Sequence, residues 1–275
     1  MENIVVDTPP DFHKLNKIEC YTATSTSVFM DNVKLNIKKC FKRFHELEDF
    51  QKIKGNGSLI ALIGGGPSIK KELDRIKDFQ LAGYPTIACG SSYDWLVENG
   101  VIPTYCTVCD PDPIVNNYIK KADKNTTFLL ASSCDEVVFD LLKDNKVYLW
   151  HCHSEECGPE VLKLDNEIGV QYQAISGGCT VGLRSISIAM MLGYTNLHFW
   201  GFDSCMGENN KHHAYGLSEE REMLGMGNTF KIKLGTDKNV NEKSKVYTCA
   251  GYQLAQAYHF QKFYAAFNQC FIPTF

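Results

Sequence analysis

A glycine-rich stretch is the first place in this sequence where residue types favour ligand binding. It follows five consecutive apolar residues, 59–63, which are typical of a strand buried on both faces of a parallel sheet. Glycine lets the backbone approach a ligand closely, and a Pro-Ser pair suits the start of a helix, whose free N–H groups bind phosphate. A glycine turn without a ligand is the alternative, because the spacing is neither G-x-G-x-x-G nor that of a P-loop. The residues of this stretch are Gly64, Gly65, Gly66, Pro67 and Ser68.

A second run of small residues also leads into a predicted helix, and carboxylates follow other predicted strands. Asp110 and Asp112 come after strand 105–109, and Asp203 after strand 196–200, although aspartates in turns and helix caps are the alternative. Ligands of parallel sheets bind at the carboxyl ends of strands, so we expect these groups and the serine of turn 90–92 to form one nucleotide-type pocket. The small residues are Ser91, Ser176, Gly177, Gly178, Cys179 and Thr180.

Histidines are found in two predicted loops. His213 follows His212 in a polar loop, and because a histidine side chain ordinarily titrates near neutral pH, it is a candidate base; solvent exposure is the alternative. The segment His151-Cys152-His153 with Cys157 has the donor types of a zinc site. A polar loop after a strand is the alternative, because no second Cys-x-x-Cys pair completes a structural site.

Composition restricts the class of protein. The 275 residues carry 28 basic and 32 acidic side chains, a net charge of −4, which predicts no general affinity for nucleic acid or membrane. No apolar run is long enough to span a membrane and the first residues do not resemble an export signal, so we expect a cytoplasmic protein. Most of the 12 cysteines lie in apolar runs, which favours reduced, buried thiols over disulfides.

Strand and helix patterns alternate along the chain, which predicts an α/β fold with a parallel sheet and right-handed crossovers. We expect an N-terminal arm over residues 1–55, irregular to residue 17 and then one or two amphipathic helices, and a main domain over 56–275. The loop 236–245 reads as a hairpin or mobile loop. Strands are predicted at 59–63, 85–89, 105–109, 127–131, 147–151, 196–200 and 246–248. Helices are predicted at 69–79, 93–98, 114–121, 136–142, from 181 to Gly193, and at 250–267.

Several short motifs occur in a characteristic order. They are Leu62-Ile63-Gly64-Gly65-Gly66-Pro67-Ser68-Ile69, Cys109-Asp110-Pro111, Ser176-Gly177-Gly178, Leu192-Gly193-Tyr194, Gly201-Phe202-Asp203 and His213-Ala214-x-Gly216. Over roughly residues 58 to 265 the chain resembles the 6-hydroxymethylpterin diphosphokinase MptE-like family, which includes the Maf (motility accessory factor) flagellin glycosyltransferases. It is also distantly similar to sialyltransferases of the Campylobacter type.

This resemblance implies a Rossmann-like, mostly parallel sheet with helices on both faces, and a transferase that uses a nucleotide-activated donor. In the glycosyltransferase branch the donor is a CMP-linked nonulosonic acid (sialic, pseudaminic or legionaminic), and no cofactor is required. In the pterin branch the donor is ATP with magnesium, and pyrophosphate is transferred. A non-catalytic nucleotide-sugar-binding accessory protein is a third possibility. The acceptor, whether glycan, protein or small molecule, stays open.

The resemblance also implies residue roles. The glycine loop 64–68, Ser91 and the turn 176–180 would contact the nucleotide donor. Asp110 would lie at the pocket floor, and Asp203 and His213 near the reacting centre, with His213 as base. In the magnesium-dependent branch Asp110, Asp112 and Asp203 would hold the metal. Gly65, Ile69 and the pair Asp112-Pro113 depart from the family pattern.

Overall fold

The structure is a computed structural model of the 275-residue chain. It describes residues 4–6, 25–39, 41–52, 57–117, 119–208, 211–216, 229–234, 246–267 and 270–272. The predicted loop at 236–245 lies outside the described residues.

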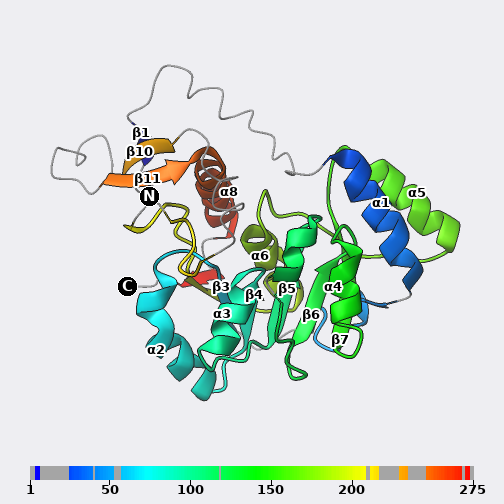
Figure 1. Cartoon of the computed structure of the whole chain (residues 1–275), viewed down its shortest axis with the longest axis horizontal. Helices are drawn as coiled ribbons and strands as arrows, with labels where there is room; N and C mark the ends of the chain where they lie inside the picture. The colour runs from blue at the N-terminus through cyan, green and yellow to red at the C-terminus, as the bar shows by residue number, and fades with distance from the viewer. Residues whose placement is uncertain are drawn as a thin grey trace.

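The main body is a sheet in which every pairing is parallel, with strand order β12-β9-β3-β4-β5-β6-β7-β2 and β8 beside the end of β7 (Figure 1). This confirms the predicted α/β class. The strands are β2 (Lys42–Arg43), β3 (Leu59–Ile63), β4 (Thr86–Cys89), β5 (Tyr105–Val108), β6 (Thr127–Ala131), β7 (Lys146–Cys152), β8 (Ala174–Ile175), β9 (Asn196–Trp200) and β12 (Phe271–Ile272).

The central strands form because their residues are apolar on both faces. Ile60, Leu62 and Ile63 of β3 are fully buried, as are Leu129 and Leu130 of β6. Such strands can exist only in the middle of a sheet with helices on both faces. The helices are α1 (Thr26–Asn36), α2 (Ile69–Leu81), α3 (Ser92–Glu98), α4 (Glu136–Leu141), α5 (Gly158–Ile168), α6 (Val181–Met191) and α8 (Gly251–Phe267).

The direction of each crossover determines on which face of the sheet its helix lies. Strands β3 to β7 succeed one another in one direction across the sheet, and then the chain returns through α6 to β9 on the other side of β3. Right-handed crossovers that run in opposite directions put their helices on opposite faces. Helix α6 therefore covers β3, β4 and β5 from the face opposite to α2, α3 and α4, and it contacts all three strands.

A second, antiparallel sheet of three strands, β1 (Ile4–Val6), β10 (Thr229–Leu234) and β11 (Val246–Ala250), lies close to α8 (Figure 1). The prediction of an irregular N-terminal segment is wrong for residues 4–6. Ile4 pairs with Leu234, so the strand depends on a partner that is very distant in the sequence. Local patterns do not reveal such pairings.

The segment between Ser25 and the first core strand contains one α-helix, α1, in agreement with the prediction of one or two helices. In the described residues, short 3-10 turns, Ile37–Lys39 and Phe44–Glu46, and the edge strand β2, which pairs with β7, follow it and were not predicted. Val33 and Phe44 share one hydrophobic core with Ile60, while the division at residue 55 stays a prediction.

Other elements also differ from the prediction. The helix expected at 114–121 is a 3-10 turn, Pro113–Asn117, and helix α5 and the strands β8, β10 and β12 were not predicted.

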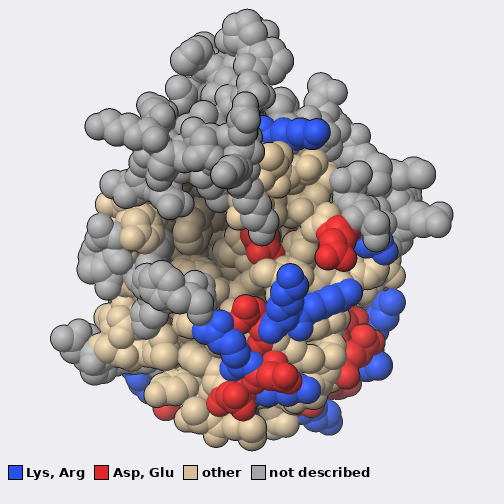
Figure 2. All heavy atoms as spheres, turned by 90° about the vertical axis from the view of Figure 1, so that its left-hand side faces the viewer, with Lys and Arg blue, Asp and Glu red and all other residues tan. Residues whose placement is uncertain are grey.

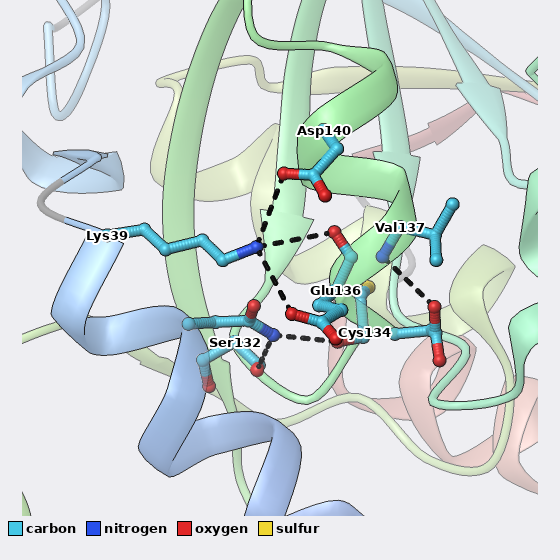
Figure 3. A network of polar contacts seen from close by, with 8 residues as sticks. Lys39, Ser132, Cys134, Glu136, Val137 and Asp140 are labelled. Atoms are coloured by element: carbon cyan, nitrogen blue, oxygen red, sulfur yellow. Dashed lines mark hydrogen bonds and ion pairs between the residues drawn. The ribbon is translucent and has the colours of Figure 1, made fainter.

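The N-terminal helix is fastened to the loop that follows β6. The buried amide of Asn36 donates to the carbonyl oxygens of Ser132 and Cys134 at 2.9 and 2.7 Å. Lys39, just beyond the helix, approaches the carboxylates of Glu136 and Asp140 at 3.8 and 3.5 Å (Figure 3). Helix α1 therefore covers the carboxyl end of the sheet near β6.

Candidate active site

The candidate site lies where the strand order reverses. β3 and β9 are parallel neighbours, but the chain leaves β3 toward β4 and returns to β9 only after the other core strands have formed. In open α/β sheets, ligands bind outside the carboxyl ends of strands at such a switch point. The loops that follow β3 and β9 are the glycine loop, 64–68, and the segment 201–203.

These two loops touch through their backbones. The Gly66 N–H donates to the Gly201 carbonyl at 2.9 Å, and the Gly64 N–H donates to that of Trp200 at 2.8 Å. A Cβ at Gly64 would lie 2.5 Å from the Gly201 oxygen, and one at Gly201 would lie 2.4 Å from the Gly64 oxygen. The glycines are therefore required by this close packing, whether or not a ligand also approaches them.

Asp203 caps helix α2. Its Oδ2 accepts a hydrogen bond from the Ser68 N–H at 2.9 Å, and a Cβ at Gly66 would lie 2.2 Å from the same oxygen. A serine hydroxyl can also cap a helix at this position, but the Ser68 side chain makes no capping bond. A carboxylate is favourable at a helix N-terminus for the same electrostatic reason as a phosphate. A phosphate at this helix start would thus lie beside Asp203.

His213 lies over the glycine loop. The Ala214 N–H donates to the Gly65 carbonyl at 2.9 Å, and a Cβ at Gly65 would be 2.7 Å from the His213 ring. Burial lowers the pKa of His213 to about 4, and the neighbouring His212 contributes to the decrease. Nδ1 of His213 is buried and makes no hydrogen bond to the described residues. The site therefore holds a neutral imidazole next to the glycine loop.

Tyr215 brings Ser91 into the same site. The two hydroxyl groups are 2.8 Å apart, and a Cβ at Gly65 would lie 2.3 Å from the Tyr215 hydroxyl oxygen. The Tyr215 ring stacks on Trp95 of α3 with centroids 6.3 Å apart, and burial raises the pKa of Tyr215. Tyr215 was not predicted from the sequence, because it occupies the variable position of the motif His213-Ala214-x-Gly216. Its position two residues after a candidate base was the signal that could have indicated it.

The turn 176–180, which precedes α6, ends at the candidate site as well. Thr180 caps α6 by accepting the Leu183 N–H at 3.3 Å, so the predicted helix start is confirmed. A Cβ at Gly182, in the first turn of α6, would lie 3.1 Å from Phe202, and a Cβ at Gly90, which follows β4, would lie 3.2 Å from Val181 of α6. The start of α6 therefore lies beside the loops that follow β4 and β9.

The rest of this turn lies near helix α8. A Cβ at Gly178 would lie 3.1 Å from Nδ1 of His259, a residue of α8 that sequence analysis did not select. Cys179, the next residue, is partly buried against the hydrophobic core. Ser176 precedes them and is exposed.

Asp110 and Asp112 follow β5, which β4 separates from β3. Oδ1 of Asp110 accepts the Asp112 N–H at 3.1 Å, so Asp110 stabilises its own turn. The adjacent Pro111 carbonyl accepts from Asn32 of α1 at 3.1 Å. Among the described residues no group of three or more His, Cys, Asp or Glu side chains is placed to hold a metal ion.

In the second histidine segment, His151 is not positioned as a zinc ligand, because its ring is already hydrogen-bonded. Both ring nitrogens of buried His151 have partners: Ser132 Oγ lies 2.6 Å from Nδ1, and Asp165 Oδ1 lies 3.0 Å from Nε2. His151 and Cys152 end strand β7, and Cys157 is buried just before α5. His151, Cys152 and Cys157 thus belong to the folded core, whereas residues 153–156 form a polar turn after the strand, as the alternative to zinc predicted, with His153 exposed.

The surface near α2 is mixed in charge. Figure 2 looks onto the end of the molecule that carries α2, where acidic and basic side chains alternate. A hollow above them is bordered mainly by uncharged side chains. No helix within the described part of the chain is both long and apolar enough to cross a membrane. The ten described cysteines are free thiols, as predicted.

Comparison with known proteins shows which family model and which solved structures the chain resembles. A family model described as 6-hydroxymethylpterin diphosphokinase MptE-like matches residues 29–209. Among solved structures, a Maf glycosyltransferase from Magnetospirillum magneticum AMB-1 matches with a TM-score of 0.54 and 15% identity, covering 86% of this chain and 35% of that protein. The chain thus spans about a third of the length of that relative. The likeness shows a shared fold.

Two structures of a mammalian sialyltransferase also match. One, in complex with Gal-beta-1-3GalNAc-ortho-nitrophenol, has a TM-score of 0.36 and 12% identity, covering 74% of this chain and 82% of that one. The other has a TM-score of 0.42 and 10% identity, covering 97% and 86%. No curated protein sequence matches the chain significantly.

Proposed function

The chain belongs to the 6-hydroxymethylpterin diphosphokinase MptE-like family, and we propose that it is a transferase that uses a nucleotide-activated donor. Within that class we propose a glycosyltransferase whose donor is a CMP-linked nonulosonic acid. The fold shared with a Maf glycosyltransferase supports this class of reaction. The acceptor is a hydroxyl group of a glycan, a protein or a small molecule.

The observation that carries the proposal is the position of His213. Its neutral imidazole lies over Gly65, at the switch point where a nucleotide is expected, and its Nδ1 makes no hydrogen bond to the described residues. Glycosyl transfer needs a base for the acceptor hydroxyl and hydrogen-bond donors for the leaving phosphate. His213 would accept the proton. Tyr215 and Ser91, whose hydroxyl groups hydrogen-bond each other, keep one hydroxyl proton that could be donated to a ligand.

Because the pKa of His213 is low, the proposed mechanism needs a step that raises this pKa before the imidazole can act as a base. A base with a pKa of about 4 accepts a proton poorly near neutral pH. A phosphate bound beside the imidazole would raise this pKa, because a negative charge favours the protonated form. Donor binding would therefore activate the base, and the free protein would keep it neutral.

The test separates chemistry from binding. Purified protein is incubated with CMP-linked sialic, pseudaminic or legionaminic acid and a panel of acceptors, and release of CMP is measured. His213→Asn should abolish turnover while CMP still binds, because the substitution removes the base and keeps a polar side chain of similar reach. The matched control is His153→Asn, since His153 is an exposed histidine. Unchanged turnover in His213→Asn would overturn the assignment.

A second candidate is the diphosphokinase reaction that gives the family its description. Magnesium is commonly held by one or two carboxylates together with the phosphates of ATP, so Asp110, Asp112 and Asp203 remain its candidate ligands. The assay supplies ATP, magnesium and 6-hydroxymethyl-dihydropterin and follows formation of AMP. AMP formation that stops on addition of a chelator would favour this reaction over glycosyl transfer.

A non-catalytic accessory role is the third candidate, and it predicts nucleotide-sugar binding without turnover in either assay. We also propose a cytoplasmic location. The free thiols of the described cysteines support it, because thiols persist in reducing compartments.

A further inference from the structure

His212 links the candidate base to the start of α8. Its Nδ1 lies 2.8 Å from the hydroxyl oxygen of Tyr252, the second residue of that helix. Its ring also packs edge-on against the ring of His213, with the ring centroids 4.7 Å apart. Tyr252 lies 40 positions further along the chain than His212. The contact therefore connects two separate parts of the fold next to the candidate base.

The first turn of α8 gives Tyr252 a defined position. The buried side chain of Gln253 accepts a hydrogen bond from the Ala250 N–H at 2.9 Å, which joins the end of β11 to the helix. Leu254 and Ala255 follow and are buried. Because 42% of Tyr252 is exposed, removal of its hydroxyl should leave this packing intact.

The loop that carries His212 is attached through its backbone on both sides of the two histidines. The Met206 N–H donates to the Thr248 carbonyl of β11 at 2.7 Å, and the Ala214 N–H donates to the Gly65 carbonyl at 2.9 Å. These bonds fix the backbone but not the imidazole rings. A ring keeps one orientation only where packing and side-chain hydrogen bonds hold it, so the contact of His212 with α8 has a role that the backbone cannot supply.

The chemistry of the two groups favours one direction for the hydrogen bond. Near neutral pH a tyrosine hydroxyl carries its proton, and an unprotonated imidazole nitrogen accepts it well. Donation from Tyr252 to Nδ1 places the proton of a neutral His212 on Nε2. Burial is the larger cause of the low pKa of His213, and a charge on His212 lowers it further. Among the described residues, Tyr215 also faces His213, with ring centroids 5.6 Å apart.

We propose that Tyr252 is a positioning residue, whose hydroxyl holds the His212 ring in one tautomer against His213, so that the candidate base keeps one orientation over Gly65. Tyr252 acts through His212 and takes no part in the chemistry itself. The contact is a property of the free protein, whereas its effect on turnover rests on the proposed function. Misplacement of a reacting group by about 1 Å can cost roughly 100-fold in rate, so an indirect contact of this kind has a functional consequence.

Nitrogen NMR of the whole protein tests the contact without any ligand. In protein made with isotope-labelled histidine, long-range proton–nitrogen correlation near neutral pH distinguishes a protonated ring nitrogen from an unprotonated one. We expect the Nε2–H tautomer alone for His212 in the parent protein. Tyr252→Phe should give a mixture of both tautomers and altered signals of the His213 ring. The signals are assigned by their loss in His212→Asn and His213→Asn.

Tyr258→Phe is the matched control. Tyr258 belongs to the same helix, and its ring, which phenylalanine retains, contacts Lys262 with Nζ 4.5 Å from the centroid. Loss of its hydroxyl should leave the signals of both histidines unchanged. The proposal is overturned if His212 of the parent protein is not the Nε2–H tautomer, if Tyr252→Phe leaves the signals of either histidine unchanged, or if Tyr258→Phe alters them equally.

Turnover tests the functional part of the proposal. In the CMP-release assay, Tyr252→Phe should lower kcat by roughly 10- to 100-fold and leave KM for the donor nearly unchanged, because the orientation of the base affects the chemical step. An equal kcat in Tyr252→Phe and the parent protein would contradict the positioning role. If the parent protein releases no CMP with any donor, the proposed function fails, and the NMR result still decides whether Tyr252 holds His212.

Discussion

Gly66 and Asp203 show how little space the candidate site leaves at the level of single residues. A Cβ at Gly66 would lie 2.2 Å from the Asp203 carboxylate and 2.7 Å from the Gly201 carbonyl. Its backbone is not in the left-handed region, so space alone excludes a larger residue. The contact also fixes Asp203 as the cap of α2.

Gly66→Ala should therefore destabilise the protein by roughly 1–3 kcal/mol, the usual cost of overpacking, because the Gly201 backbone would have to move. Gly158→Ala is the matched control: no atom lies within 4 Å of its Cβ position and its φ is not positive, so stability should stay the same or rise slightly. Urea unfolding measures both. Equal stability of the two variants would show that the loops separate easily.

His213 makes stability depend on pH in a defined direction. Its pKa in the folded protein is about 4, below the ordinary value of 6.5, so between these pH values the unfolded chain binds a proton that the folded protein does not. Stability should therefore fall as the pH decreases from 6.5 toward 4, with a limit on the order of 1.4 kcal/mol per pKa unit.

His213→Asn removes this contribution, so the variant should lose less stability than the parent protein over that pH range. Chemical unfolding at a series of pH values tests the prediction, with His153→Asn as the control because its side chain is exposed. A constant difference in unfolding free energy between parent and His213→Asn across the range would contradict it.

At the scale of elements, α1 is held by two kinds of contact of unequal strength (Figure 3). Asn36 is fully buried and donates two hydrogen bonds to the loop after β6, whereas Lys39 pairs with carboxylates that are largely exposed. Exposed ion pairs contribute little, but removal of a buried donor leaves carbonyl groups unpaired.

We expect Asn36→Ala to reduce the unfolding free energy by about 1–3 kcal/mol. Lys39→Ala should cost less than about 1 kcal/mol, and added salt should reduce even that difference. Thermal or urea unfolding of both variants gives the comparison. A larger cost for Lys39→Ala than for Asn36→Ala would mean that α1 is held mainly by its charges.

The core elements are the ones that the sequence could predict. The predicted bounds of β3, β6 and β9 are confirmed; each strand is mainly apolar and is followed directly by glycine or serine. β1 and β2 were missed because they are short and take their stability from distant partners. α5 was missed because it lies in a mixed segment, with few buried residues to mark a face.

The candidate site was predictable in outline. Glycines and carboxylates after strands indicated the carboxyl edge of the sheet, where the structure brings together the glycine loop, Ser91, Thr180, Asp203 and His213. The capping role of Asp203 and the contact between Tyr215 and Ser91 depend on how separate loops fold over one another. No local pattern encodes such contacts.

For the whole molecule, the strand order is the feature with the greatest functional consequence. Reversal of the chain between β3 and β9 leaves a place for a ligand at the carboxyl edge, with α6 reaching it from one face and α2 from the other. The central claim is that a nucleotide-activated donor binds there.

Tyr215→Phe tests where binding occurs, because it removes only the hydroxyl that contacts Ser91. Tyr84→Phe is the control, since Tyr84 is exposed and lies in the loop before β4. Stabilisation by the nucleotide should be smaller in Tyr215→Phe and unchanged in Tyr84→Phe.

The most direct measurement is a thermal-shift series with CMP, CDP, UDP, GDP and ATP, each with and without magnesium. A ligand at a hundredfold excess over its dissociation constant stabilises the folded state by about 2.7 kcal/mol. We predict a shift with CMP that needs no metal. A shift with ATP and magnesium alone would replace the glycosyltransferase with the diphosphokinase, and no shift with any nucleotide would contradict the central claim.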